Sequence, residues 1–152
     1  MSEKRSGASS VTLNQNTLWI TGGENDYVDL NSTEFLSFGQ QQNSKKGPDL
    51  PFTIERHGMV IYKENSIFII GGYQDGALSG KSWIVDLSRG GLKLKEGPTL
   101  NIARSSHATG KMIINGKTLL VVAGGRNTKI LDSVEILDPT SGKGWIEGKH
   151  SE

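Results

Sequence analysis

Few residues of this chain have the types and spacing that catalysis would need. The chain has no Cys, which excludes a disulfide framework, Cys-ligated zinc and a Cys nucleophile. No Gly-x-Ser-x-Gly sequence supports a serine triad. Residues 76–82 end in Gly-Lys-Ser, as phosphate-binding loops do, but Asp75 occupies the glycine position that such loops need. A carboxylate there would repel phosphate, so we expect a connecting loop and no enzymatic activity.

Histidines are the remaining candidate metal ligands. His57 and His107 lie 50 residues apart (107 − 57), at one position of an internal repeat, and His150 lies near the end of the sequence. A repeated position indicates a structural role. A zinc site would need further ligands that converge on the same point. We therefore expect no metal and no cofactor.

Arginines are better candidates for a binding site. Arg5 and Arg104 occupy one repeat position, and Arg126 directly follows a double glycine where the preceding repeat has Tyr73. A guanidinium binds a carboxylate through two parallel hydrogen bonds, which suits capture of an acidic peptide. The alternative is a solvated loop charge or a salt bridge between repeats. The candidate partner-binding residues are Arg5, Tyr73, Arg104, Arg126 and Asn127.

Three short apolar runs, each ending in a double glycine, organise the chain around these residues. They end at Gly22-Gly23, Gly71-Gly72 and Gly124-Gly125, with spacings of 49 (72 − 23) and 53 (125 − 72) residues. A fixed period of about 50 residues indicates a repeat protein. Each run predicts a strand buried on both faces. Glycine reaches positive φ and permits close approach, so the six glycines are expected to be structural.

Further strand-like runs fall at matching places in each unit. The second unit predicts strands over 57–62, 66–70, 82–87 and 92–95, and the third over 112–114, 119–123, 134–139 and 145–148. The first unit predicts strands over 7–13, 18–21 and 33–38, whereas 40–46 is polar and poorly patterned. No stretch has a sustained helical period. Repeated four-stranded units of this length are typical of propeller blades.

The chain resembles the kelch repeat over essentially its whole length. The resemblance rests on the double-glycine runs and on Glu34, Glu135, Asp138-Pro139, Trp145 and the stretch 104–107. It implies an all-β, kelch-type β-propeller in a partial array of three four-stranded antiparallel blades, over 1–48, 49–98 and 99–152 of one domain. The sequence departs from the family at Leu36, Val85 and Leu137, where the family has tyrosine, and the family's late tryptophan, a structural residue, occurs only as Trp145.

The resemblance implies a protein–protein interaction module. Kelch propellers often place arginines, at the start of the first strand and after the double glycine, on the face that binds partner peptides. Related proteins are substrate adaptors of ubiquitin ligases or bind actin. The alternative is a carbohydrate-binding or sugar-modifying propeller, although the copper-dependent oxidases among them need a Cys that this chain lacks.

Charge and hydropathy narrow the class of partner. Lys and Arg total 17 against 16 Asp and Glu, so no overall field favours nucleic acid or anionic lipid. No run approaches the ~20 apolar residues of a membrane span, and the N-terminus does not resemble a signal peptide. We expect a cytoplasmic protein. Three blades do not close a ring, so we expect either part of a longer chain or a homodimer that closes a six-bladed ring.

Overall fold

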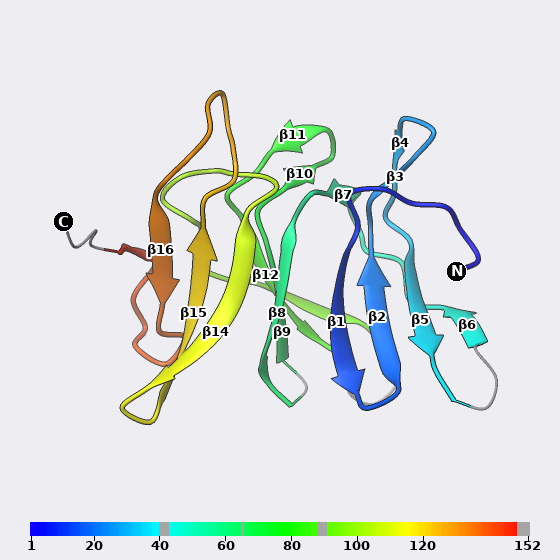
Figure 1. The fold of residues 1–152 in the computed structure, drawn as a ribbon, viewed down its shortest axis with the longest axis horizontal. Coiled ribbons are helices and arrows are strands. Elements are labelled where there is room, and N and C mark those ends of the chain that lie inside the picture. The colour runs from blue at the N-terminus through cyan, green and yellow to red at the C-terminus, as the bar shows by residue number, and fades with distance from the viewer. Residues whose placement is uncertain (40–42, 65, 88–90, 149–152) are drawn as a thin grey trace.

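The computed structural model describes residues 1–39, 43–64, 66–87 and 91–148, and their regular structure is entirely β (Figure 1). Three four-stranded antiparallel sheets follow one another along the chain. The prediction of an all-β fold built from four-stranded antiparallel units is therefore confirmed. Among the described residues, no helix is long and apolar enough to cross a membrane.

Each of the three sheets is a simple meander, in which strands that follow one another in the unit pair side by side. The first sheet contains β1 (Ser9–Asn14), β2 (Thr17–Thr21), β5 (Thr33–Ser37) and β6 (Asn43–Lys46). The second sheet contains β8 (Gly58–Lys63), β9 (Ser66–Ile70), β12 (Ser82–Asp86) and β13 (Lys93–Glu96). The third sheet contains β14 (Ala108–Ile114), β15 (Lys117–Ala123), β16 (Val134–Leu137) and β17 (Ile146–Glu147).

Five two-residue strands add small sheets beside the double glycines. The pair β3 and β4 is a separate hairpin, whereas β10 pairs with both β7 and β11. Their bounds are β3 (Glu24–Asn25), β4 (Val28–Asp29), β7 (Ile54–Glu55), β10 (Tyr73–Gln74) and β11 (Ala77–Leu78). The sequence pattern does not predict them, because two residues are too few to show an alternation.

The main strands agree with the sequence pattern best where the pattern is strongest. The strand β9 spans the predicted 66–70, whereas β6 forms in the polar stretch where no strand pattern is visible. β6 is an outer strand, mostly exposed, so it needs no apolar alternation. The strand β14 begins at Ala108, four residues before the predicted start, because residues 108–111 also pair with β15. Ala, Gly and Lys are depleted in strands, so the sequence pattern does not show this part of β14.

Two apolar cores hold the three sheets together. One lies between the first and second sheets and includes Trp19, Met59 and Ile69. The other lies between the second and third sheets and includes Phe68 and Leu120. The second sheet thus packs against another sheet on both faces. The first and third sheets, at opposite ends of the array, each have one face that packs against no other sheet, which we call the uncovered face (Figure 1). The array is open over the described residues.

Trp145 belongs to the second of these cores. It is 4% exposed, and its indole N–H donates a hydrogen bond to the Pro98 carbonyl at 2.9 Å. Its own carbonyl accepts a hydrogen bond from the Asn101 side-chain amide at 2.9 Å. These contacts attach the end of the third sheet to the segment that leads into it.

The double glycines place each sheet against the next. All six have positive φ, from 59° at Gly22 to 91° at Gly23. An ideal Cβ on Gly22 would overlap the carbonyl of Ile54, and one on Gly71 would lie 2.7 Å from the carbonyl oxygen of Arg104. The first glycine of the first two pairs therefore admits the backbone that leads into the following sheet.

Candidate functional site

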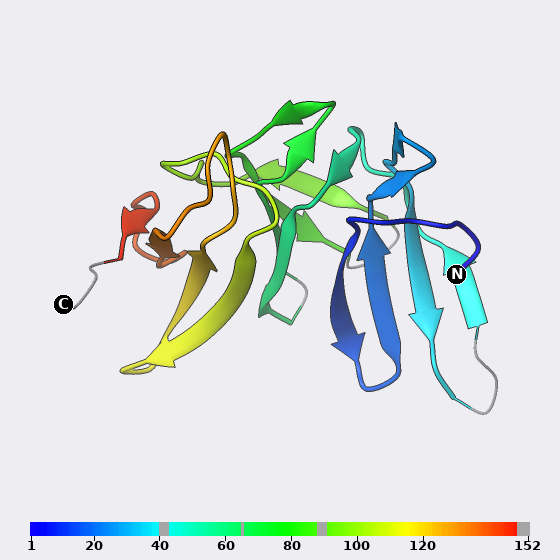
Figure 2. The same cartoon turned by 45° about the horizontal axis from the view of Figure 1, so that its top comes forward.

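The loops that follow the three double glycines gather at one edge of the sheets, which we call the loop edge. It consists of 24–29, 73–78 and 126–132, at the top of Figure 1 and brought forward in Figure 2. Loops on a rigid scaffold are common carriers of binding residues. Three of the five candidate binding residues, Tyr73, Arg126 and Asn127, lie on this edge. The other two, Arg5 and Arg104, are buried beneath it.

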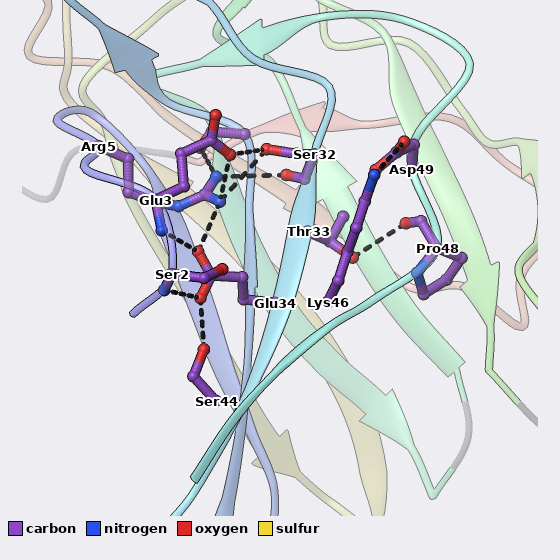
Figure 3. A network of polar contacts seen from close by, with 11 residues as sticks. Ser2, Glu3, Arg5, Ser32, Thr33, Glu34, Ser44, Lys46, Pro48 and Asp49 are labelled. Atoms are coloured by element: carbon purple, nitrogen blue, oxygen red, sulfur yellow. Dashed lines mark hydrogen bonds and ion pairs between the residues drawn. The ribbon is translucent and has the colours of Figure 1, made fainter.

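The side chain of Arg5 is buried against the first sheet, where it contacts Glu34 of β5 (Figure 3). Its guanidinium is 3.0 Å from Glu34, and the two side chains are 1% and 2% exposed. It also donates to the carbonyl oxygen of Gly22 at 2.6 Å. Ser2, Ser44 and Arg5 all donate hydrogen bonds to Glu34. Burial opposes ionisation of this carboxyl, but these donors hold the pKa of Glu34 at about 2.

Arg104 repeats the arrangement in the third sheet. Its guanidinium is 2.9 Å from Glu135, and the side chains are 0% and 2% exposed. It donates to the carbonyl of Gly124 at 2.9 Å and to that of Ser133 at 3.0 Å. In both sheets the arginine lies in the segment that leads into the sheet, and its ion pair connects this segment to the third main strand of the sheet, β5 or β16. This corrects the expectation that Arg5 and Arg104 contact a partner, because both side chains are buried and the terminal nitrogens of both guanidinium groups already donate hydrogen bonds within the chain.

The second sheet replaces this charged cluster with apolar groups. Ile54 stands at the arginine position and Trp83 at the glutamate position, opposite Ile69 in the strand register. Ile54 is 1% exposed, and Phe52 stacks on Trp83 with ring centroids 4.9 Å apart. Pro51, which has no N–H, replaces the residue whose N–H binds the glutamate in the other sheets.

Arg126 is the candidate arginine that does reach solvent. It is exposed, and it makes no ion pair within the described residues. Its backbone is fixed by two hydrogen bonds with Ser105, both 2.9 Å. Asn127 is half-buried and accepts the N–H of Lys129 through its side-chain oxygen at 3.1 Å, so it shapes the loop. Tyr73 is half-buried in β10.

Several large apolar side chains of the loop edge are exposed, and Tyr27 and Ile130, the two most exposed, were not predicted from the sequence. Tyr27 is 97% exposed at the turn between β3 and β4, and Ile130 is 87% exposed in the loop after Gly125. Tyr27 has φ of 70°, an uncommon conformation for a residue other than glycine. Both lie in stretches without apolar periodicity, so no sequence signal separated them from ordinary loop residues.

Acidic residues cluster beside Arg56 on the same edge. Carboxylate oxygens of Glu24, Asp29 and Glu55 lie within 4.8 Å of one another. Arg56 is 3.6 Å from Glu24 and 3.4 Å from Glu55, so it supplies a countercharge where a cation would otherwise bind. Burial raises the pKa of Glu55, although Arg56 opposes the shift. The arrangement is an ion-pair network, and we infer no metal site from it.

The two repeated histidines lie between the sheets. His57 is 6% exposed, and its Nε2 is 2.8 Å from the Thr21 hydroxyl on the neighbouring sheet. Burial lowers the pKa of His57 to about 3, with a contribution from His107. Burial and the charge of Arg104 lower the pKa of His107 to about 4. Both imidazoles are therefore neutral near pH 7, in line with a packing role.

Comparison with known proteins adds no assignment for this site. The chain matches no protein-family model and no curated protein.

Proposed function

We propose that the chain is a kelch-type β-propeller module that binds a protein partner through its loop edge. Tyr27, Arg126 and Ile130 are its main contact residues. The repeated sheets and double-glycine turns support the kelch-type assignment. A substrate-adaptor or actin-binding role follows only from the resemblance in sequence, and each would use the same edge.

The exposure of Tyr27 and Ile130 is the observation that carries the proposal. Side chains that are 97% and 87% exposed place large apolar area on the loop edge, where it is available to a partner. Tyrosine and arginine are also the residue types that most often dominate binding energy in protein interfaces. Together with the unpaired Arg126, they supply apolar area and one directional charge.

The charge of the loop edge suggests the nature of the partner. The loop 126–132 carries Arg126, Lys129 and Asp132, whereas 24–29 carries Glu24, Asp26 and Asp29. A partner segment with acidic residues and one large apolar side chain would match the 126–132 loop. Its charged contacts are exposed to solvent, so binding should weaken as salt concentration rises.

Selection of displayed peptides by the purified protein would test this function. We expect enrichment of peptides that combine Asp or Glu with an apolar residue. The double variant Tyr27→Ala/Arg126→Ala should bind them about tenfold more weakly or worse, which corresponds to about 1.4 kcal/mol or more of lost binding free energy.

A matched control uses the opposite edge of the sheets. Phe38 is 47% exposed and Lys143 is exposed, so Phe38→Ala/Lys143→Ala removes an aromatic group and a cation of the same types. It should leave peptide affinity unchanged. Equal affinity of the two double variants, or selective binding of glycans in place of peptides, would contradict the proposal.

A further inference from the structure

The backbone contacts between successive sheets repeat, and the repeat is incomplete at both ends of the array. The N–H of Gly23 donates to the carbonyl of Ile54 at 2.8 Å, and the N–H of Gly72 donates to that of Arg104 at 2.9 Å. The corresponding N–H of Gly125 and the corresponding carbonyl of Arg5 have no such partner within the described residues.

A second series of contacts runs in the opposite direction. The N–H of Arg56 donates to the carbonyl of Gly7 at 2.7 Å, and the N–H of Ser106 donates to that of Arg56 at 2.9 Å. Over the described chain this leaves the N–H of Gly7 and the carbonyl of Ser106 unmatched. Each end of the array thus offers one donor and one acceptor, in positions that complement those of the other end.

The uncovered face of the third sheet is apolar. In the strand register, Met112, Val121 and Ile136 lie on this face, because their neighbours in the strands, such as Leu120 and Leu137, point into the core. Met112 is 40% exposed. At the equivalent positions of the second sheet, Tyr62, Phe68 and Ile84 pack on the third sheet. The third sheet therefore has the kind of face that receives a further sheet.

The uncovered face of the first sheet resembles the face of the third sheet that is already packed. Leu18, Ile20 and Leu36 on the first sheet correspond in register to Leu120, Val122 and Leu137. The buried Arg5–Glu34 pair corresponds to Arg104–Glu135. A face of this composition packs on the second sheet elsewhere in the same molecule.

Side-chain size also matches at the closest point between the two faces. An ideal Cβ on Gly58 would overlap Thr109 and lie 2.8 Å from His107 Nε2, so this internal contact needs a glycine. At the uncovered faces, Ala108 replaces Gly58, and the residues that would oppose it are Ser10 and Ala8. The larger residue on one face is thus accompanied by smaller residues on the other.

A hollow on the third sheet gives a place for one further side chain. It is lined by Ile102, by residues 127 and 129–133, and by Glu147. Leu50 and Leu100, which lead into the second and third sheets, are 1% and 4% exposed, whereas Met1 at the same repeat position is 61% exposed. A Met1 side chain from another first sheet would fill the equivalent place.

We propose that the partner of these faces is a second copy of this chain. The third sheet of each copy packs on the first sheet of the other, so that two contacts related by a two-fold axis close a ring of six sheets. Such a head-to-tail contact would otherwise grow into a filament, and closure by two copies uses every open face. This assembly does not depend on the proposed function of the loop edge.

Introduced cysteines can report the contact directly, because the chain has none of its own. In the proposed pair, position 10 of one copy faces position 108 of the other, as Thr109 faces Gly58 within the chain. Mixing Ser10→Cys with Ala108→Cys under mild oxidation should yield a disulfide-linked dimer of about twice 16.5 kDa. A mixture of Phe38→Cys and Ala108→Cys, with Phe38 away from the contact, should give no such product.

Complementary variants separate this arrangement from other dimers. Val121→Asp should convert the dimer to a folded monomer in sedimentation equilibrium, and so should Ser10→Arg. A mixture of the two variants should dimerise again, because one of its two contacts is then wild type and the other pairs opposite charges. Ile113→Asp, which changes a 72% exposed residue on the other face of β14, should remain dimeric.

Each alternative outcome overturns the proposal. A wild-type protein that is a folded 16.5 kDa monomer at tens of micromolar would show that the faces do not bind a second copy. A ladder of larger species would exclude the closed pair. A dimer that Val121→Asp leaves intact, or no disulfide between positions 10 and 108, would place the contact elsewhere. Circular dichroism distinguishes any variant that has merely unfolded.

Discussion

At the scale of single residues, the buried charged cluster of the third sheet is a sensitive point in the core. Glu135 accepts hydrogen bonds from Arg104 and from the N–H of Asn101 and of Ile102. Arg104→Ile would leave a buried carboxylate without its cation. We expect a loss of about 3–5 kcal/mol in the free energy of unfolding, measured by urea denaturation.

The second sheet supplies the design of a compensating variant. It carries Pro51, Ile54 and Trp83 at the positions of Asn101, Arg104 and Glu135. The triple variant Asn101→Pro/Arg104→Ile/Glu135→Trp removes the carboxylate together with two of its three donors, the Arg104 guanidinium and the Asn101 N–H. It should recover much of the stability that the single variant loses, since apolar replacement of a whole buried ion pair is often neutral. A triple variant less stable than Arg104→Ile would contradict this explanation.

At the scale of the structural elements, the double-glycine turns have two separable roles. Gly22 and Gly124 have nearly equal φ, 59° and 64°, so alanine at either position has a similar backbone strain of about 1–2 kcal/mol. Their surroundings differ. A Cβ on Gly22 would overlap Ile54 of the next sheet's lead-in, whereas a Cβ on Gly124 would meet only the Leu131 carbonyl, at 3.5 Å.

These two glycines therefore form a matched pair for mutation. Gly22→Ala should lower the melting temperature clearly more than Gly124→Ala in a monomeric background such as Val121→Asp. The difference between the two decreases in melting temperature reports the clash with the neighbouring sheet, because the strain from positive φ is similar at both positions. Equal destabilisation by the two substitutions would show that the conformation of the turn alone requires glycine.

At the scale of the whole molecule, the sheets are joined by interfaces that contain buried neutral histidines. The pKa of His57 is lowered from 6.5 to about 3 by burial and by His107. Between these values the unfolded chain binds a proton that the folded chain does not, so stability is complete above pH 6.5 and falls as the pH falls. We expect a loss of about 2 kcal/mol from His57 between pH 6.5 and 5.

Urea denaturation at several pH values would measure this dependence. The variant His57→Gln should show a flatter dependence between pH 6.5 and 5 than the wild type, even if it is less stable at pH 7. His107, whose pKa is lowered to about 4, should contribute in the same direction. If the wild type lost less stability than His57→Gln between pH 6.5 and 5, His57 would not be a buried neutral imidazole.

The fold was largely predictable from the sequence, and the candidate site only in part. The period of the double glycines and the apolar run at 66–70 are local patterns, so they predicted antiparallel four-stranded units correctly. The four-stranded repeat implied the polar strand β6, but no local pattern located it, because an exposed outer strand needs no apolar alternation. Tyr27 and Ile130 lie in loops, where exposure follows from the course of the backbone and leaves no periodic signal.

The sequence by itself determined which residues repeat, and only the tertiary structure decided what the repetition is for. Arg5 and Arg104 occupy the same position of the repeat, and this repetition was equally compatible with contact to a partner and with a salt bridge between repeats. Their burial against Glu34 and Glu135 shows a salt bridge within one repeat rather than between repeats, because a glutamate about 30 residues away becomes a neighbour only when the sheet forms. The matching of the two uncovered faces likewise depends on strand register and side-chain direction, which arise from packing between segments distant in sequence.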